Sequence, residues 1–101
     1  MPAKKADSKS PDAFALSFGA RVGVLRERAG LSFAQFAEPM GTSKGYVWQV
    51  EKGEIVPTLR NAARMAVVLN VSLAELMEGV DISAIELGSR PYRGKNRASD
   101  G

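Results

Sequence analysis

Histidine and cysteine are both absent from this chain of 101 residues. Without cysteine the chain has no disulfide and no thiolate metal site, so a domain of this size depends on side-chain packing alone. Without histidine it lacks the commonest general base and the commonest transition-metal ligand, which excludes histidine-dependent hydrolytic triads and zinc sites of the His/Cys kind. The sequence also has no glycine-rich phosphate loop and no nucleophile elbow. We therefore predict that the protein is not an enzyme and needs no cofactor.

Long apolar runs are missing as well. The longest, such as residues 65–69, fall far short of the roughly 20 residues that span a bilayer. The polar N-terminal sequence "MPAKKADSKSPD" has no apolar stretch of the kind found in a secretory signal. With 45% apolar and 25% charged residues, the composition is that of an ordinary globular domain. These features predict a cytoplasmic protein with no membrane association.

Positive charge is scarce in the centre of the chain. The net charge of +3 and the pI of about 9.5 favour a nucleic-acid partner. Between residues 13 and 87, however, seven bases are outnumbered by eight acids. The surplus of bases lies at the two ends: Lys4, Lys5, Lys9, Arg90, Arg93, Lys95 and Arg97. A case for DNA binding therefore has to rest on where individual side chains lie and not on total charge.

Apolar periodicity predicts five short helices between residues 13 and 79, and hence an all-α fold. The first helix should begin near Ser17, and its apolar face is made by residues at helical spacing: Phe18, Val22, Leu25 and Ala29. Ser32 and Gln35 have the spacing of a capping box for the second helix. We expect Pro39 to bend or shorten the last turn of that helix, because its ring clashes with the preceding turn.

Three more helices follow the turn at Gly41. Each has a polar residue that can cap its first turn, namely Ser43, Thr58 and Ser72, and Ser72 has the spacing of a capping box with Glu75. The residues expected to face the core are Val47 and Val50 in the third helix, Leu59, Ala62, Met65, Ala66 and Leu69 in the fourth, and Leu73 and Leu76 in the fifth. Glycine or asparagine stands where these helices should stop.

The chain divides into four segments by composition. Residues 1–12 form a polar arm and residues 88–101 a basic, glycine-rich tail, and we predict both to be disordered. Residues 13–79 form the helical domain. Residues 80–87 contain Val80, Ile82 and Ile85, and are too short to assign as helix or strand. This segment is equally consistent with ordinary packing and with a dimerisation surface.

The second and third helices have the residue types of a helix-turn-helix unit. The unit needs a small residue where the helices cross, a left-handed residue in the turn and apolar residues on the second helix: Ala37, Gly41, Val47 and Val50. The sequence "LRERAGLSFAQFAEPMGTSKGYVWQVEKGEIVPTLRNAARMAVVLNVSLAELM" resembles the lambda-repressor-like, Cro/C1-type (XRE family) regulators over about residues 17–78. Within that family, the pattern S-x-x-Y-V-x-x-V-E-x-G is most similar to the small dimeric controllers of restriction–modification systems.

The resemblance implies a five-helix domain that binds double-stranded operator DNA, usually as a homodimer, with the helix from Ser43 in the major groove. The matched positions predict DNA contacts by Thr42 and Ser43 at phosphates, by Lys44, Gly45 and Gln49 at bases, and by Tyr46 in the groove. Lys52 and Arg60, two further cations, complete the predicted DNA-binding set. Chemistry agrees for two of these, since Lys44 can donate to guanine and Gln49 can pair with adenine. The resemblance also implies a partly buried salt bridge between Arg26 and Glu51.

Three residues depart from the family pattern. Phe33 stands where the family commonly has a glutamine that grips a phosphate. Gly45 costs about 1 kcal/mol of helix propensity relative to alanine, but it lets DNA approach closely. Trp48 occupies a position that is usually small or polar, and we interpret it as a packing residue rather than a base-stacking one.

Two functional hypotheses follow. The first is a homodimeric transcriptional regulator, a repressor or autoregulator that binds an inverted-repeat operator. The second is a protein-interaction module of the antitoxin or antiactivator type, which would present Phe33, Tyr46 and Trp48 to a protein partner. The near-neutral central charge and the missing phosphate anchor at Phe33 favour the second hypothesis, whereas the motif itself favours the first.

Overall fold

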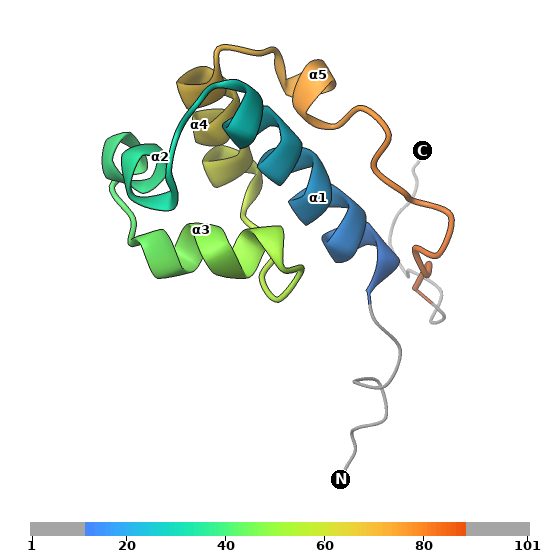
Figure 1. Ribbon diagram of the computed structural model, residues 1–101. Coiled ribbons are helices and arrows are strands. Elements are labelled where there is room, and N and C mark those ends of the chain that lie inside the picture. Colours follow the sequence, from blue (N-terminus) through green and yellow to red (C-terminus); the bar gives the residue numbers. More distant parts are fainter. Residues whose placement is uncertain (1–11, 89–101) are drawn as a thin grey trace, which may run out of the picture.

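The computed structural model describes residues 12–88, which contain five α-helices and no strand (Figure 1). The helices are α1 (Ala13–Arg28), α2 (Phe33–Met40), α3 (Lys44–Glu51), α4 (Leu59–Leu69) and α5 (Leu73–Leu76). The predicted all-α, five-helix architecture is therefore confirmed. The two predicted disordered tails lie, except for residues 12 and 88, outside the described part of the chain. Within residues 12–88, no helix combines the length and the hydrophobicity that crossing a membrane requires.

Helix α1 begins four residues earlier than the sequence pattern predicts. The Asp12 carboxylate accepts hydrogen bonds from the backbone N–H groups of Phe14 and Ala15, at 3.0 and 3.2 Å. This N-cap starts the helix at Ala13, so the predicted start near Ser17 is wrong. The expected apolar face is also too long at its other end, because Ala29 lies beyond the last helical residue and is exposed.

Helix α2 has the predicted capping box. The Ser32 hydroxyl accepts from the Gln35 N–H at 3.1 Å, and the Gln35 side-chain oxygen accepts from the Ser32 N–H at 2.8 Å. Of the two effects expected of Pro39, a bent or a shortened last turn, the shortening does not occur, because the helix runs through Pro39 to Met40. Gly41 then ends the helix in the left-handed conformation, at φ 72°. A proline this near the C-terminus removes only one intrahelical hydrogen bond, and the helix tolerates that loss.

One apolar core joins all five helices. The largest side chains with almost no exposed surface are Val22 of α1, Phe36 of α2, Val47 and Val50 of α3, Met65 of α4 and Leu76 of α5. Burying each of these side chains contributes about 1.5–3 kcal/mol, which is how so small a domain is stabilised without a disulfide. Leu59, expected in the core, is instead 75% exposed, and Leu73 is 38% exposed. Both are the first residues of their helices, and the residues that precede them, Thr58 and Ser72, lie at the surface of the protein.

Helix α3 lies across α1 at very short range, and α5 lies on the other side of α1 (Figure 1). A Cβ atom added at Gly19 would collide with the carbonyl oxygen of Val50 and lie 2.7 Å from that of Glu51. A Cβ atom at Gly23, one turn later, would lie 3.0 Å from a carboxylate oxygen of Glu51. Two glycines on one face of α1 therefore allow the C-terminal end of α3 to pack closely against it.

Candidate nucleic-acid interface

The start of α3 is an exposed, capped helix N-terminus. The Ser43 hydroxyl accepts a hydrogen bond from the backbone N–H of Tyr46 at 3.0 Å. Ser43, Lys44 and Gly45 are all exposed. The N–H groups in the first turn of a helix have no acceptor within it, so those of Lys44 and Gly45 point outward at the positive end of the helix dipole. This end of α3 can therefore bind an anion such as a phosphate oxygen.

Gly45 is not required by the fold. A Cβ atom added there would meet only the Ser43 hydroxyl oxygen, at 3.7 Å, which is ordinary van der Waals contact. Alanine would improve helix propensity by up to about 1 kcal/mol, so glycine has no packing advantage at this position. Gly45 thus differs from Gly19, whose missing side chain makes room for a neighbouring helix.

Three exposed side chains follow one another at four-residue intervals along α3 and its C-cap: Lys44, Trp48 and Lys52. The Lys52 ammonium lies 5.5 Å from the centroid of the Trp48 ring. Trp48, interpreted from sequence as a packing residue, is 42% exposed. Gln49 is half-buried beside it. The outer surface of α3 therefore carries two lysines with an aromatic ring between them.

Thr42 and Tyr46, two residues of the predicted DNA-binding set, are both partly buried. The Thr42 hydroxyl oxygen is buried and has no hydrogen-bond partner, and its N–H donates to the carbonyl oxygen of Ala37 at 3.2 Å. A phosphate contact through the Thr42 hydroxyl therefore requires this side chain to rotate. Tyr46 is half-buried, and its hydroxyl oxygen accepts from the side-chain Nδ2 of Asn61 at 3.1 Å.

Asn61 connects α3 to α4. Its side-chain oxygen accepts from Nη1 of Arg64 at 2.6 Å, while its Nδ2 donates to Tyr46. Arg60, the residue before it, is exposed in the first turn of α4. From the sequence, Arg64 is a weaker phosphate candidate than Arg60, because it lies one turn farther from the loop before α4. The contact of Asn61 with Tyr46 was not predicted, since the two residues are fifteen positions apart and nothing in the local pattern marks it.

Arg26 and Glu51, matched in sequence to a salt bridge of the family, form one here. Nε of Arg26 lies 2.6 Å from Oε2 of Glu51, and Nη2 lies 3.2 Å from Oε1. Nη1 donates to the carbonyl oxygen of Leu31 at 2.8 Å. The hydrogen bond to Glu51 raises the pKa of Arg26 further above its ordinary value, despite the opposing effect of burial. The pair fixes the end of α3 to the end of α1.

Phe33 has a partner that explains its departure from the family pattern. The guanidinium carbon of Arg26 lies 4.2 Å from the centroid of the Phe33 ring, a close cation–π arrangement. Phe33 is half-buried and packs against the core. The first residue of α2 therefore supports the Arg26–Glu51 pair, and it offers no donor to a phosphate.

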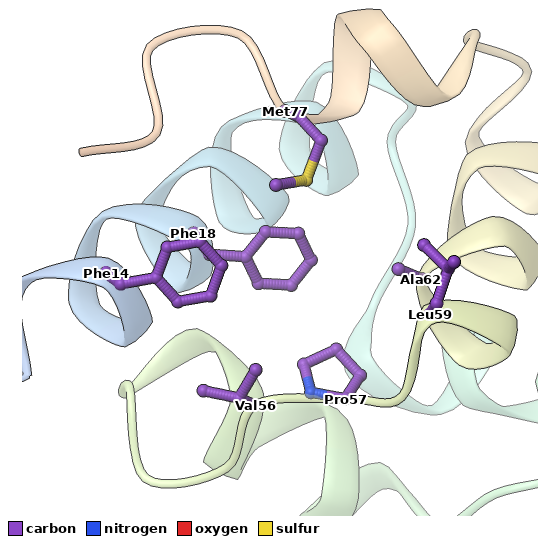
Figure 2. A pocket seen from close by; sticks show the side chains of 7 residues that line it. All are labelled: Phe14, Phe18, Val56, Pro57, Leu59, Ala62 and Met77. Atoms are coloured by element: carbon purple, nitrogen blue, oxygen red, sulfur yellow. The ribbon is translucent and has the colours of Figure 1, made fainter. Parts of the chain in front are cut away.

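Apart from this surface of α3, the fold has a hollow that is lined by apolar side chains (Figure 2). It has a volume of about 200 Å³ and is lined by Phe14, Phe18, Val56, Pro57, Leu59, Ala62 and Met77. Figure 2 shows these side chains arranged around the opening from α1, the segment before α4, the start of α4 and the end of α5. Leu59 lies at its rim, which accounts for the exposure of that residue. The lining supplies no acid, base or hydrogen-bonding side chain.

A comparison with protein-family models matches residues 17–78 to the helix-turn-helix domain. No curated protein matches the chain. Among solved structures, the restriction–modification controller protein C.AhdI from Aeromonas hydrophila is 34% identical with a TM-score of 0.62, and the match covers 64% of this chain and 98% of that one. A transcriptional regulator of the HTH_3 family from Vibrio cholerae is 30% identical with a TM-score of 0.59, covering 63% of this chain and 36% of that one.

The clp gene regulator ClgR from Corynebacterium glutamicum has a TM-score of 0.64 at 22% identity, over 67% of this chain and 72% of that one, and it supports the fold alone. The family match spans more than half of the chain, and the two neighbours at 30% identity or more are a controller protein and a transcriptional regulator. The chain therefore belongs to the helix-turn-helix domain family, as a DNA-binding transcriptional regulator of the XRE type.

Proposed function

We propose that this regulator is a cytoplasmic homodimer that binds an inverted-repeat operator and represses transcription, including that of its own gene. The observation that carries the proposal is the exposed N-terminus of α3. Gly45 leaves the backbone there accessible beside Lys44, and no other helix or loop packs against that position. An exposed helix start in which Gly45 has no side chain, with exposed lysines at both ends of the helix (Lys44 and Lys52), fits into a DNA major groove.

The residues divide into two kinds of DNA contact. Lys44 and Gln49 read base edges, the first through guanine acceptors and the second through adenine, and Gly45 permits close approach. Phosphates are bound by the first-turn N–H groups after Ser43, by Thr42 once its hydroxyl turns outward, and by the cations Lys52 and Arg60. Tyr46 lies at the edge of the groove. Arg26 and Glu51 have a structural role, because their pairing sets the orientation of α3.

A two-fold dimer would place two copies of α3 in successive major grooves, about 34 Å apart. The likeness to a restriction–modification controller at 34% identity supports a small regulator of this design. Residues 80–87 supply a candidate dimer surface next to the helical domain of residues 13–79, since they include three exposed aliphatic side chains: Ile82, Ile85 and Leu87, at 68%, 52% and 88%. Val67 on α4, at 78%, is the alternative.

Selection of random duplex DNA at near-physiological salt tests the proposal. Sequencing of the retained duplexes should recover an inverted repeat with half-sites about one helical turn apart. Light scattering should give the mass of a dimer, and a reporter driven by the gene's own upstream region should be less active when the protein is present. No enrichment above background would refute operator binding, and recovery of a single asymmetric site would refute the two-fold dimer.

A structural observation also favours the protein-interaction hypothesis, the 42% exposure of Trp48 on α3. Large aromatic side chains of this kind are often the centre of a protein interface. Salt separates the two functions, because binding through phosphates weakens steeply as salt rises whereas an aromatic contact with a protein changes little. A Trp48→Ala variant that keeps operator binding but loses an antitoxin-like or antiactivator-like partner would show that both functions occur in one chain.

A further inference from the structure

The hydrogen-bond chain from Arg64 through Asn61 to Tyr46 has only one possible direction. A guanidinium group has donors and no acceptor, so the amide atom that faces Arg64 at 2.6 Å must be the oxygen. The nitrogen of the same amide then faces Tyr46, at 3.1 Å, and donates to it. Arg64 thus determines which end of the Asn61 amide is turned toward α3.

The direction of this donation determines where the Tyr46 proton points. A tyrosine hydroxyl has one proton to donate and two lone pairs that can accept. Since its oxygen accepts from Asn61, its own proton must point away from Asn61. Within residues 12–88 that proton has no acceptor, so the hydroxyl presents an unused donor.

The surroundings of this donor favour an anionic acceptor. Tyr46 belongs to the first turn of α3 and Asn61 to the first turn of α4, so the positive ends of both helix dipoles are nearby. Arg60, the neighbour of Asn61, adds an exposed positive charge. Base edges offer mixtures of donors and acceptors, whereas a phosphate oxygen only accepts. The acceptor that best fits this group is therefore a backbone phosphate.

We propose that the Tyr46 hydroxyl donates a hydrogen bond to a phosphate oxygen of the operator, and that Asn61 and Arg64 are positioning residues that orient this hydroxyl toward the DNA. The inference rests on the proposed operator binding. It adds two residues outside the DNA-binding set predicted from sequence, and it changes Tyr46 from a general groove contact to a phosphate contact whose direction is set by the protein.

A double-mutant cycle tests this, with the duplex recovered by selection as the probe and salt held constant. Tyr46→Phe removes only the hydroxyl and should weaken binding about tenfold, as expected for a lost hydrogen bond to a charged group. Asn61→Asp keeps the pairing with Arg64 but cannot donate, so the Tyr46 proton should turn inward. In that background Tyr46→Phe should change binding less than about twofold. The added negative charge affects both members of the comparison equally and cancels.

Asn70→Asp is the matched control, because it places the same charge at the far end of α4, where Asn70 caps the helix. Tyr46→Phe should still cost about tenfold there. If Tyr46→Phe reduces affinity equally in all three backgrounds, Asn61 does not direct the proton. If it does not reduce affinity in the wild-type background, the hydroxyl does not contact DNA. Either result overturns this inference but leaves the proposed operator binding intact. Failure of the wild-type protein to retain any duplex would overturn the proposed function, and this inference with it.

Discussion

Gly19 in α1 lies directly against the backbone of Val50 in α3, so closely that a Cβ atom would collide with the Val50 carbonyl oxygen. This contact fixes the distance between α1 and α3, the helix that bears the residues proposed to contact DNA. A Cβ atom at Gly45, on α3 itself, would make only an ordinary van der Waals contact, with the Ser43 hydroxyl oxygen at 3.7 Å. The two glycines therefore have opposite physical roles, and the same substitution distinguishes them.

Gly19→Ala should destabilise the protein by about 1–3 kcal/mol, because the added methyl group can be accommodated only by moving α3 away from α1. Urea denaturation of the two proteins gives the difference. Ala20→Ser, a change at the exposed neighbour of Gly19, is the control and should stay within about 0.5 kcal/mol of wild type. An unchanged midpoint for Gly19→Ala would contradict the close packing described here.

Gly45→Ala should have the opposite effect on stability and a clear effect on binding. The free energy of unfolding should rise by up to about 1 kcal/mol through helix propensity. Operator affinity should fall about tenfold, since the methyl group occupies space that DNA needs, at a cost within the 1–3 kcal/mol typical of overpacking. Thermal unfolding and a binding titration measure the two quantities. Unchanged affinity would mean that DNA does not approach α3 at this point.

Glu51→Ala should destabilise the protein by about 3 kcal/mol, because it leaves the Arg26 guanidinium buried without its carboxylate. Arg26→Lys should also destabilise the protein although it keeps the positive charge. One ammonium group cannot pair with both carboxylate oxygens of Glu51, donate to the Leu31 carbonyl and stack on Phe33 at the same time. Denaturant unfolding measures both changes. Glu54→Ala, at an exposed carboxylate nearby, should be neutral within about 0.5 kcal/mol.

Lys44→Ala should relax specificity at one base position in each half-site, at a cost of about 1–3 kcal/mol for the preferred sequence. Lys52→Ala should instead weaken binding to all sequences alike and reduce the salt dependence by about one counterion. Repeating the DNA selection with each variant compares the two patterns. If Lys44→Ala reduces the affinity for all sequences equally, Lys44 contacts a phosphate and not a base.

Asp81 should titrate below its ordinary pKa in the folded protein. Its carboxylate accepts from the side-chain hydroxyl of Ser83 at 2.6 Å and from the Ser83 N–H at 2.8 Å, and both bonds favour the charged form. Because the pKa of Asp81 is lower in the folded state than in the unfolded state, its charged form stabilises the turn at pH values above the unfolded-state pKa. This stabilisation is lost as the pH falls through the folded-state pKa. An NMR titration should show the Asp81 pKa moving up toward its usual value in Ser83→Ala. No movement would contradict this turn.

The helix boundaries were predictable where the deciding interaction is local. The pairs Ser32 with Gln35 and Ser72 with Glu75 form their capping boxes as the sequence pattern predicts. Two of the errors lie at helix starts, where the apolar period does not decide the outcome. Asp12 began α1 early, since its carboxylate was not considered as a cap. Leu59 fits the apolar period of α4 but lies at the helix start, where the protein does not enclose it.

The site residues divide in the same way. Ser43, Lys44, Gly45 and Gln49 could be proposed from a motif because they lie within one short helix, and the Arg26–Glu51 pair was anticipated only through the resemblance to a family. The cation–π contact of Phe33 with Arg26, the contact of Gly19 with Val50 and the bond from Asn61 to Tyr46 were not anticipated. A cap and its acceptor are held within bonding distance by the geometry of one helical turn, so residue order is enough to identify them. Contacts between α1, α3 and α4 depend on how whole helices cross, and only the packed core determines those crossings.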